Sequence, residues 1–150
     1  MAYYGRNVLK KTISQFEGMG LTPYVGIELE AYVFQKDRYG KWVPYDTPGA
    51  YVYGTGSTVD PAGLIDEVWE QAEACSIELE SFHSEFDSPQ FELTLKYDKA
   101  LEAVDQIFLF KAMAKEIFEQ NGYLLSFMPK PLSKTGGSGM HVNFSFNDKK

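Results

Sequence analysis

The sequence predicts an α+β domain in which a mostly antiparallel β-sheet packs against helices. The first observation is a set of segments rich in β-branched and aromatic residues, typical of strands, at 24–34, 77–86, 90–97, 123–128 and 140–146. The second is the turn Asp87-Ser88-Pro89 between two of these segments, which favours a hairpin. The third is the helical spacing of apolar residues in other segments. This order of strands and helices indicates an α+β fold.

Sequence features typical of helices occur between these predicted strands. Residues 5–17 carry apolar side chains at helical spacing, and glycines follow directly. Asp60, followed by proline, predicts the start of a second helix, and Asp98 predicts the start of a third. The segment 35–58 is rich in Gly, Pro and Tyr, so we expect a turn, a short strand at Trp42 and a surface loop.

The composition narrows the classes of function. A net formal charge of −7 over 150 residues argues against a nucleic acid or an anionic membrane as the main partner. Arg6 and Arg38 are the two arginines, and neither lies near the acidic motifs. Phosphate handling usually needs guanidinium groups, so either the chain does not handle phosphate or another segment does. A single cysteine, Cys75, and the lack of a signal-like or membrane-length segment predict a cytoplasmic protein.

Acidic side chains recur in the strand-like segments. The candidates are Glu28, Glu30, Glu80, Glu85 and Glu92, with His141 in G-S-G-M-H. Residues two apart on a strand share a face, so Glu28 and Glu30 point the same way. A solvated face explains each pair taken alone, but carboxylates that converge require a counter-cation. Oxygen ligands with one imidazole favour Mg²⁺ or Mn²⁺ over zinc.

The last strand also has two faces. One carries the polar residues His141, Asn143, Ser145 and Asn147, and the other carries Met140, Val142, Phe144 and Phe146. We expect the polar face to line a cleft and the apolar face to pack on the helices. His83 shares a strand face with Glu85, where a surface imidazole is favoured over a partner of the acids.

Several motifs together resemble the glutamine synthetase family. G-I-E-L-E-A-Y-V-F is similar to its paired-glutamate strand, and E-S-F-H-S-E-F-D-S-P-Q-F-E-L to its H-E-x-x-x-x-Q-x-E hairpin. D-Q-I-F-L-F-K, F-M-P-K-P-L and G-S-G-M-H-V-N follow in the order of its core signature, so the likeness covers residues 6–146. The resemblance implies a curved, mostly antiparallel sheet with helices packed on one face, as in a truncated glutamine synthetase catalytic domain.

The resemblance also implies metal ligands. Glu30, Glu85 and Glu92 match the ligands of one Mg²⁺ or Mn²⁺ ion, and Glu28 and His141 match ligands of the other. Each of these positions lies inside one of the matching motifs. Two divalent cations are therefore expected among the five side chains.

Nucleotide and substrate positions follow from the same comparison. Glu80, Tyr97 and Asn143 match positions that bind ATP, where the Tyr97 ring would stack on adenine. Gly137 and His141 match positions that meet the amino-acid substrate. Any catalytic group beyond these is expected in segments outside the 150 residues.

Two positions depart from the family pattern. Gly136 stands where the family commonly has Asn before G-S-G, which removes a side chain expected to hold the glutamate amino group. Asn143 stands where many members have the second histidine of His-x-His, next to the nucleotide. The first departure bears on the amino-acid substrate and the second on the nucleotide contacts.

The resemblance implies an ATP-dependent glutamate–ammonia ligase that works through γ-glutamyl phosphate. Its partners would be ATP, glutamate and ammonia or another amine, without nucleic acid or membrane, in a large homo-oligomer. Residues 1–150 would form part of the catalytic domain, with the N-terminal β-grasp domain and the C-terminal half of the catalytic domain absent. The chain alone would then be inactive. The alternatives are a related γ-glutamyl ligase that uses another amine, a non-catalytic relative, and an unrelated acidic α+β binding domain.

Overall fold

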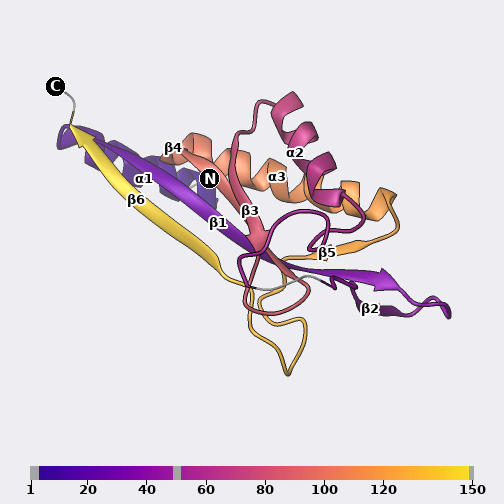
Figure 1. Ribbon diagram of the computed structural model, residues 1–150. Helices are drawn as coiled ribbons and strands as arrows, with labels where there is room; N and C mark the ends of the chain where they lie inside the picture. Colours follow the sequence, from indigo (N-terminus) through magenta and orange to yellow (C-terminus); the bar gives the residue numbers. More distant parts are fainter. Residues whose placement is uncertain (1–3, 49–51, 149–150) are drawn as a thin grey trace.

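The computed structural model describes residues 4–48 and 52–148, which fold into an antiparallel sheet of six strands with three helices (Figure 1). The strands are β1 (Leu21–Lys36), β2 (Trp42–Pro44), β3 (Leu79–Ser84), β4 (Gln90–Lys99), β5 (Leu124–Ser126) and β6 (Met140–Asp148). The helices are α1 (Gly5–Gly18), α2 (Leu64–Ala74) and α3 (Ala100–Gln120). Positions 49–51 of the surface loop expected at 35–58 lie outside the described residues.

The long strand β1 organises the sheet. Tyr32 pairs with Gln90 of β4 and with Ser126 of β5, so these two strands lie on opposite edges of β1. The register places β6 on the same edge as β5, and β2 on the same edge as β4. The hairpin partner β3 then extends the sheet beyond β4. Every neighbouring pair is antiparallel, which confirms the predicted sheet and hairpin.

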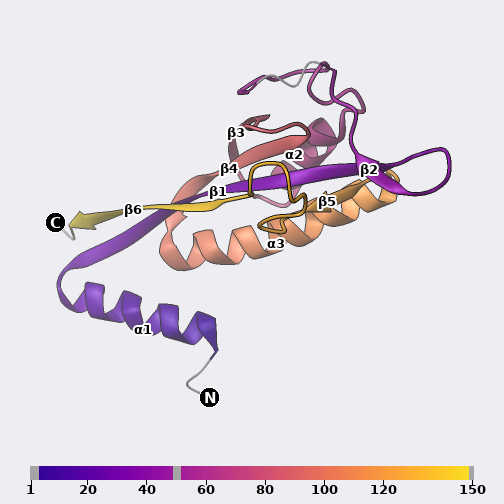
Figure 2. The ribbon, with the colours of Figure 1, turned by 90° about the horizontal axis from the view of Figure 1, so that it is seen from below.

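The helices pack on one face of the sheet. Helix α3 packs against β1, β4 and β5, and α2 packs against β3 and α3. Figure 2 shows α1 and α3 on the same side of β1 and β6. Alternate β1 residues Ile27, Leu29 and Ala31 enter the core with the apolar side chains of α2 and α3. Glu28 and Glu30 therefore point to the opposite face, which confirms the predicted alternation.

The start of α2 corrects the sequence prediction. The helix begins at Leu64 rather than at Asp60, and its N-cap residue is Gly63 in the left-handed conformation. Asp60 still serves the helix, because one carboxylate oxygen accepts the Ile65 amide hydrogen at 2.7 Å. The other oxygen accepts the Tyr45 hydroxyl at 3.0 Å. The sequence signal identified Asp60 as a residue that bonds the first turn of the helix, but it placed the helix start too early.

The apolar face of β6 also differs from the prediction. Val142 and Phe144 pair with core residues of β1, yet Val142 is exposed and Phe144 is 72% exposed. Helices α2 and α3 pack against β1, β3, β4 and β5 and not against this strand. The ring of Phe16 on α1 contacts Phe146, with centroids 4.7 Å apart. The alternation of the strand was correct, but among its apolar residues Met140, Val142 and Phe144 are exposed and only Phe146 is described in contact with a helix.

Within the described part of the chain, we find no helix that combines the length and apolarity needed to cross a bilayer.

Candidate metal and nucleotide site

Strand register gathers the predicted acids on the sheet face that the helices leave open. Glu28 of β1 lies opposite His141 of β6, and Glu30 lies opposite Glu92 of β4. Glu92 in turn lies opposite His83 of β3. Adjacent strands in a sheet are about 4.8 Å apart, so these partners reach one another without any loop rearrangement. We call the set Glu28, Glu30, His83, Glu85, Glu92 and His141 the acidic row.

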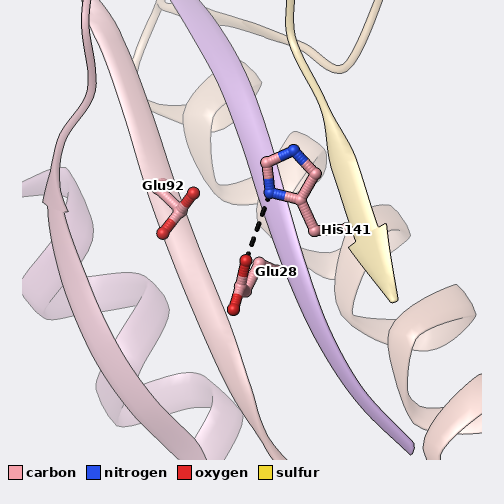
Figure 3. Close-up of side chains that lie close together, drawn as sticks. All are labelled: Glu28, Glu92 and His141. Atoms are coloured by element: carbon pink, nitrogen blue, oxygen red, sulfur yellow. Dashed lines mark hydrogen bonds and ion pairs between the residues drawn. The ribbon is translucent and has the colours of Figure 1, made fainter. Parts of the chain in front are cut away.

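Two overlapping groups of ligand atoms form within the acidic row. Atoms of Glu28, Glu92 and His141 lie within 4.8 Å of one another, and Figure 3 shows these side chains meeting from β1, β4 and β6. Atoms of His83, Glu85 and Glu92 form a second group within the same limit. Glu92 belongs to both groups, so it lies between the two candidate ion positions.

This grouping differs in detail from the ligand sets implied by the resemblance. Glu28 and His141 do lie together, with Glu28 Oε2 3.2 Å from His141 Nδ1. Glu85 and Glu92 also lie together, but Glu30 belongs to neither group of ligand atoms. Its Oε1 lies 3.7 Å from His141 Nε2. Glu30 therefore borders the space between the groups.

The carboxylate of Glu30 accepts hydrogen bonds that were not predicted from the sequence. Its Oε2 accepts a hydrogen from Gln90 Nε2 and from the Gly139 amide, each at 2.9 Å. Gln90 is 1% exposed, and its Nε2 also donates to the Gly137 carbonyl at 2.9 Å. Sequence reasoning missed Gln90 as a positioning residue. The available signals were its position as the Q of the H-E-x-x-x-x-Q-x-E motif and its place two residues before Glu92 on the same strand face.

Gly139 permits a close approach between β1 and β6. A Cβ atom at this position would lie 2.7 Å from His141 Nε2 and 2.9 Å from Glu30 Oε1. The Glu30 amide also donates to the Gly139 carbonyl at 3.1 Å. A residue without a side chain thus lets a backbone segment close one end of the acidic row.

The electrostatics of the row show why it suits a cation. Burial raises the pKa of Glu92, and the neighbouring Glu28, Glu85 and Glu30 raise it further. His83 opposes the shift, since its Nε2 lies 3.1 Å from Glu92 Oε1. His83 is therefore not the surface imidazole that the sequence favoured, because its side chain is 21% exposed and contacts the acid. Carboxylates that repel one another in this way are stabilised by a divalent cation.

A cavity of about 270 Å³ adjoins the acidic row and contains all three predicted ATP-binding residues. Glu80, Tyr97 and Asn143 line it together with Glu28. Asn143 Nδ2 donates to Glu28 Oε1 at 2.9 Å, which links the cavity wall to the acids. The Tyr97 ring is exposed and packs edge-on against Tyr24, with centroids 6.3 Å apart. An exposed ring with an adjacent acid is suited to stacking on a base and bonding a ribose.

The loop before Gly137 brings Asp87 against Gly136. Asp87 Oδ2 accepts the Gly136 amide hydrogen in a short contact, and Tyr32 donates its hydroxyl to the Gly136 carbonyl at 2.9 Å. A Cβ atom at position 136 would lie 2.7 Å from Asp87 Oδ2. The carboxylate therefore occupies the space that a side chain at this position would need.

These observations define the class of protein. It is an α+β domain with clustered carboxylates on the open face of an antiparallel sheet, beside a cavity lined partly by aromatic side chains. The family model described as glutamine synthetase, catalytic domain, matches residues 3–150. The chain belongs to the glutamine synthetase family, and the match lies in its catalytic domain.

Curated relatives agree with this assignment. The chain is 33% identical to glutamine synthetase of Halobacterium salinarum, over 96% of this chain and 32% of the relative. It is 36% identical to glutamine synthetase of Pyrococcus abyssi, over 93% of this chain and 31% of the relative. The chain thus spans about a third of the length of these relatives.

Solved structures confirm the fold. GmaS without ligand is 26% identical, with a TM-score of 0.82, and the match covers 96% of this chain and 34% of that chain. GmaS in complex with ADP gives the same identity, TM-score and coverage. Plasmodium falciparum glutamine synthetase gives a TM-score of 0.80 at 22% identity over 96% of this chain and 34% of that chain, a likeness of fold alone.

Proposed function

We propose that the chain is part of an ATP-dependent glutamine synthetase, which joins glutamate to ammonia through γ-glutamyl phosphate. The observation that carries the proposal is the meeting of Glu28, Glu92 and His141 from three strands, with ligand atoms within 4.8 Å of one another. The cavity that holds Tyr97 lies beside this group. Such a combination suits a reaction between two anions, the ATP phosphates and the glutamate carboxylate, that need cations between them.

The donor set fits Mg²⁺ or Mn²⁺. The acidic row offers carboxylate oxygens with imidazole nitrogens, which these ions accept. In the proposal, Glu28 and His141 would hold one ion, and Glu30, Glu85 and Glu92 would hold the other. Ions bound there would supply positive charge opposite the phosphate oxygens and the charge of phosphoryl transfer.

The chain's own residues keep the ligands in place. Gln90 and the Gly139 amide fix the orientation of Glu30 through its Oε2. Asn143 fixes Glu28 in the same way through Oε1. Side chains fixed by partners lose little freedom when a ligand binds, so positioning of this kind contributes to catalysis. We assign these residues a positioning role.

In the proposal, ATP and glutamate bind on opposite sides of the acidic row. ATP binds with adenine on the Tyr97 ring and its ribose near Glu80, and the solved GmaS structure with ADP supports nucleotide binding at this fold. Glutamate lies at Gly137 and His141, on the side of the row where Gln90 reaches the Gly137 carbonyl. The γ-carboxylate oxygen takes the γ-phosphoryl group from ATP, ADP leaves, and the amine nitrogen then displaces phosphate and loses a proton.

We further propose that residues 1–150 form part of the catalytic domain of a larger, homo-oligomeric cytoplasmic enzyme. The two arginines, Arg6 and Arg38, lie outside the acidic row, and Arg6 pairs with Asp105. The guanidinium groups that hold phosphate in such enzymes would come from segments beyond the chain. The chain alone is therefore expected to show no turnover with ATP, glutamate and hydroxylamine.

Nucleotide binding by the chain tests the proposal without requiring turnover. A fluorescent ADP analogue should bind in the presence of Mn²⁺, and Tyr97→Ala should weaken binding by about tenfold through lost stacking. Tyr39→Ala, which removes an exposed ring on the β1–β2 turn, serves as the matched control and should leave binding unchanged. Equal loss in both variants, or binding independent of Tyr97, would contradict the assigned adenine position.

A related γ-glutamyl ligase that uses another amine is a second candidate. The contact between Asp87 and Gly136 stands where the family commonly has the side chain expected to hold the glutamate amino group, so it bears on the amino-acid substrate and not on the amine. A screen of ammonia, methylamine and longer amines with the complete protein, read out as glutamate-dependent ATP hydrolysis, distinguishes the two candidates. Hydrolysis fastest with ammonia supports glutamine synthetase, and hydrolysis fastest with a larger amine supports the second candidate. The absence of activity with every amine would indicate a non-catalytic relative.

A further inference from the structure

A second cavity, of about 780 Å³, is lined by residues of β1, β2, β5 and the C-terminal half of α3. Figure 1 shows that these elements meet at one end of the sheet. Its lining shares no residue with the acidic row or with the cavity that contains Tyr97. Volumes of a few hundred to about 1,000 Å³ are typical of sites for small organic molecules. The cavity is therefore large enough for a ligand and separate from the proposed active site.

Three lysines surround this cavity, and each lies over an aromatic ring. Lys36 Nζ lies 5.1 Å from the centroid of the Trp42 ring. Lys111 Nζ and Lys115 Nζ lie 5.0 Å and 5.7 Å from the centroid of the Phe127 ring. Residues four apart on a helix share a face, so α3 directs the two side chains to the same ring. Cation–π contacts of this kind restrict the ammonium groups to one region of the cavity.

The charge of the cavity contrasts with that of the chain. Three lysines and one glutamate, Glu119, line it, so its formal charge is +2, whereas the whole chain carries −7. Trp42 and Phe127 add flat apolar surface to the same lining, and Leu124 and Met128 extend it. A positively charged cavity with aromatic walls attracts anions that also have an apolar group, and it repels simple cations.

We propose that this cavity binds a small organic anion, with a flat apolar ring packed against Phe127 and Trp42 and a carboxylate or phosphate held by Lys36, Lys111 and Lys115. The ring displaces water from the apolar lining, and the anion pairs with ammonium groups that line the same cavity. The inference does not rest on the proposed function, because it uses no residue of the acidic row.

Titration calorimetry with 2-naphthoate as the probe tests the site. The measurement is made in EDTA, so that metal at the acidic row plays no part. We expect saturable binding of 2-naphthoate and at least tenfold weaker binding of the neutral isostere 2-naphthamide. A parallel titration with 2-naphthyl phosphate shows which anionic group binds more tightly. Equal affinity for the acid and the amide, or no saturable binding of either anion, would overturn the proposal.

Two matched double variants test whether 2-naphthoate binds in this cavity. Lys111→Gln with Lys115→Gln should weaken 2-naphthoate binding by about tenfold or more, and Lys10→Gln with Lys11→Gln on α1 should leave it unchanged. Both pairs remove two charges from a helix, so a general charge effect would appear equally in both. In the unsubstituted chain, amide NMR shifts should move at Phe127 and Tyr123 and stay in place at Glu28. Shifts confined to other parts of the chain, or equal loss in the two double variants, would contradict the assignment.

Discussion

Within the described residues, two regions contain acids that are largely shielded from solvent, and these regions are built in opposite ways. At the start of α2, Asp60 is 6% exposed and its two oxygens accept hydrogens from Tyr45 and Ile65. In the acidic row, Glu92 has a side chain that is 12% exposed and faces Glu28, Glu30 and Glu85. Burial raises the pKa of both carboxyls, but the charged neighbours around them differ.

The difference separates a structural acid from a candidate ligand. Neutral donors from the chain itself satisfy Asp60, so this carboxylate needs no other partner to stabilise the fold. The acids of the row raise one another's pKa, and a divalent cation would relieve that repulsion. We therefore expect substitutions in the two regions to change stability in opposite directions in the absence of metal.

The largest expected effect on stability is at Asp60. Asp60→Ala leaves the Tyr45 hydroxyl and the Ile65 amide without their acceptor, which should lower the free energy of unfolding by about 2–4 kcal/mol. Asp60→Asn keeps an acceptor oxygen for Ile65 and should lose less than half as much. Urea unfolding followed by circular dichroism measures both values. An alanine variant as stable as the original chain would refute a structural role for this carboxylate.

Gly139→Ala should act on metal binding more than on the fold. The added methyl group displaces the side-chain ends of His141 and Glu30, so Mn²⁺ affinity should fall by about tenfold, or roughly 1.4 kcal/mol. Gly18→Ala, where a methyl group meets no atom within 4 Å, is the control. Calorimetric titration of both variants with Mn²⁺ provides the measurement. Unchanged affinity in Gly139→Ala would show that the close approach has no bearing on the ions.

Glu92→Gln should stabilise the metal-free chain slightly. At pH 8, where an imidazole is ordinarily neutral, the substitution removes a buried charge that three other acids repel. We expect a gain of up to about 1 kcal/mol in the free energy of unfolding, measured in EDTA. Glu116→Gln on the exposed surface of α3 should change it by less than about 0.5 kcal/mol. A clear loss of stability in Glu92→Gln would mean that the charge of Glu92 stabilises the acidic row without a cation.

The smallest effect is the pH dependence of that gain. The pKa of Glu92 lies above its ordinary value of 4.5 in the folded chain, so the folded state holds this proton more tightly than the unfolded state does. Ionisation of Glu92 therefore lowers stability as pH rises from about 4.5 through its folded pKa. The advantage of Glu92→Gln should shrink as pH falls from 7 towards 4.5. An advantage that grows on acidification would reverse the assigned direction of the pKa shift.

Sequence patterns predicted what depends on local spacing. Strand alternation placed Glu28 and Glu30 on one face, and the hairpin brought β3 beside β4. The positioning role of Gln90 was not predicted, because it depends on hydrogen bonds to Glu30 and Gly137, which lie far from Gln90 in the sequence. The exposed Phe144 shows a second limit, since alternation defines the faces of a strand but does not say which layer covers them.

Thermal unfolding with added Mn²⁺ tests most directly whether the acidic row binds divalent cations. A ligand at one hundred times its Kd stabilises a fold by about 2.7 kcal/mol, so the melting temperature should rise with saturation by several degrees. The rise should disappear in Glu92→Gln and persist in Glu116→Gln. A melting temperature that Mn²⁺ leaves unchanged, or raises equally in both variants, would contradict cation binding by the acidic row.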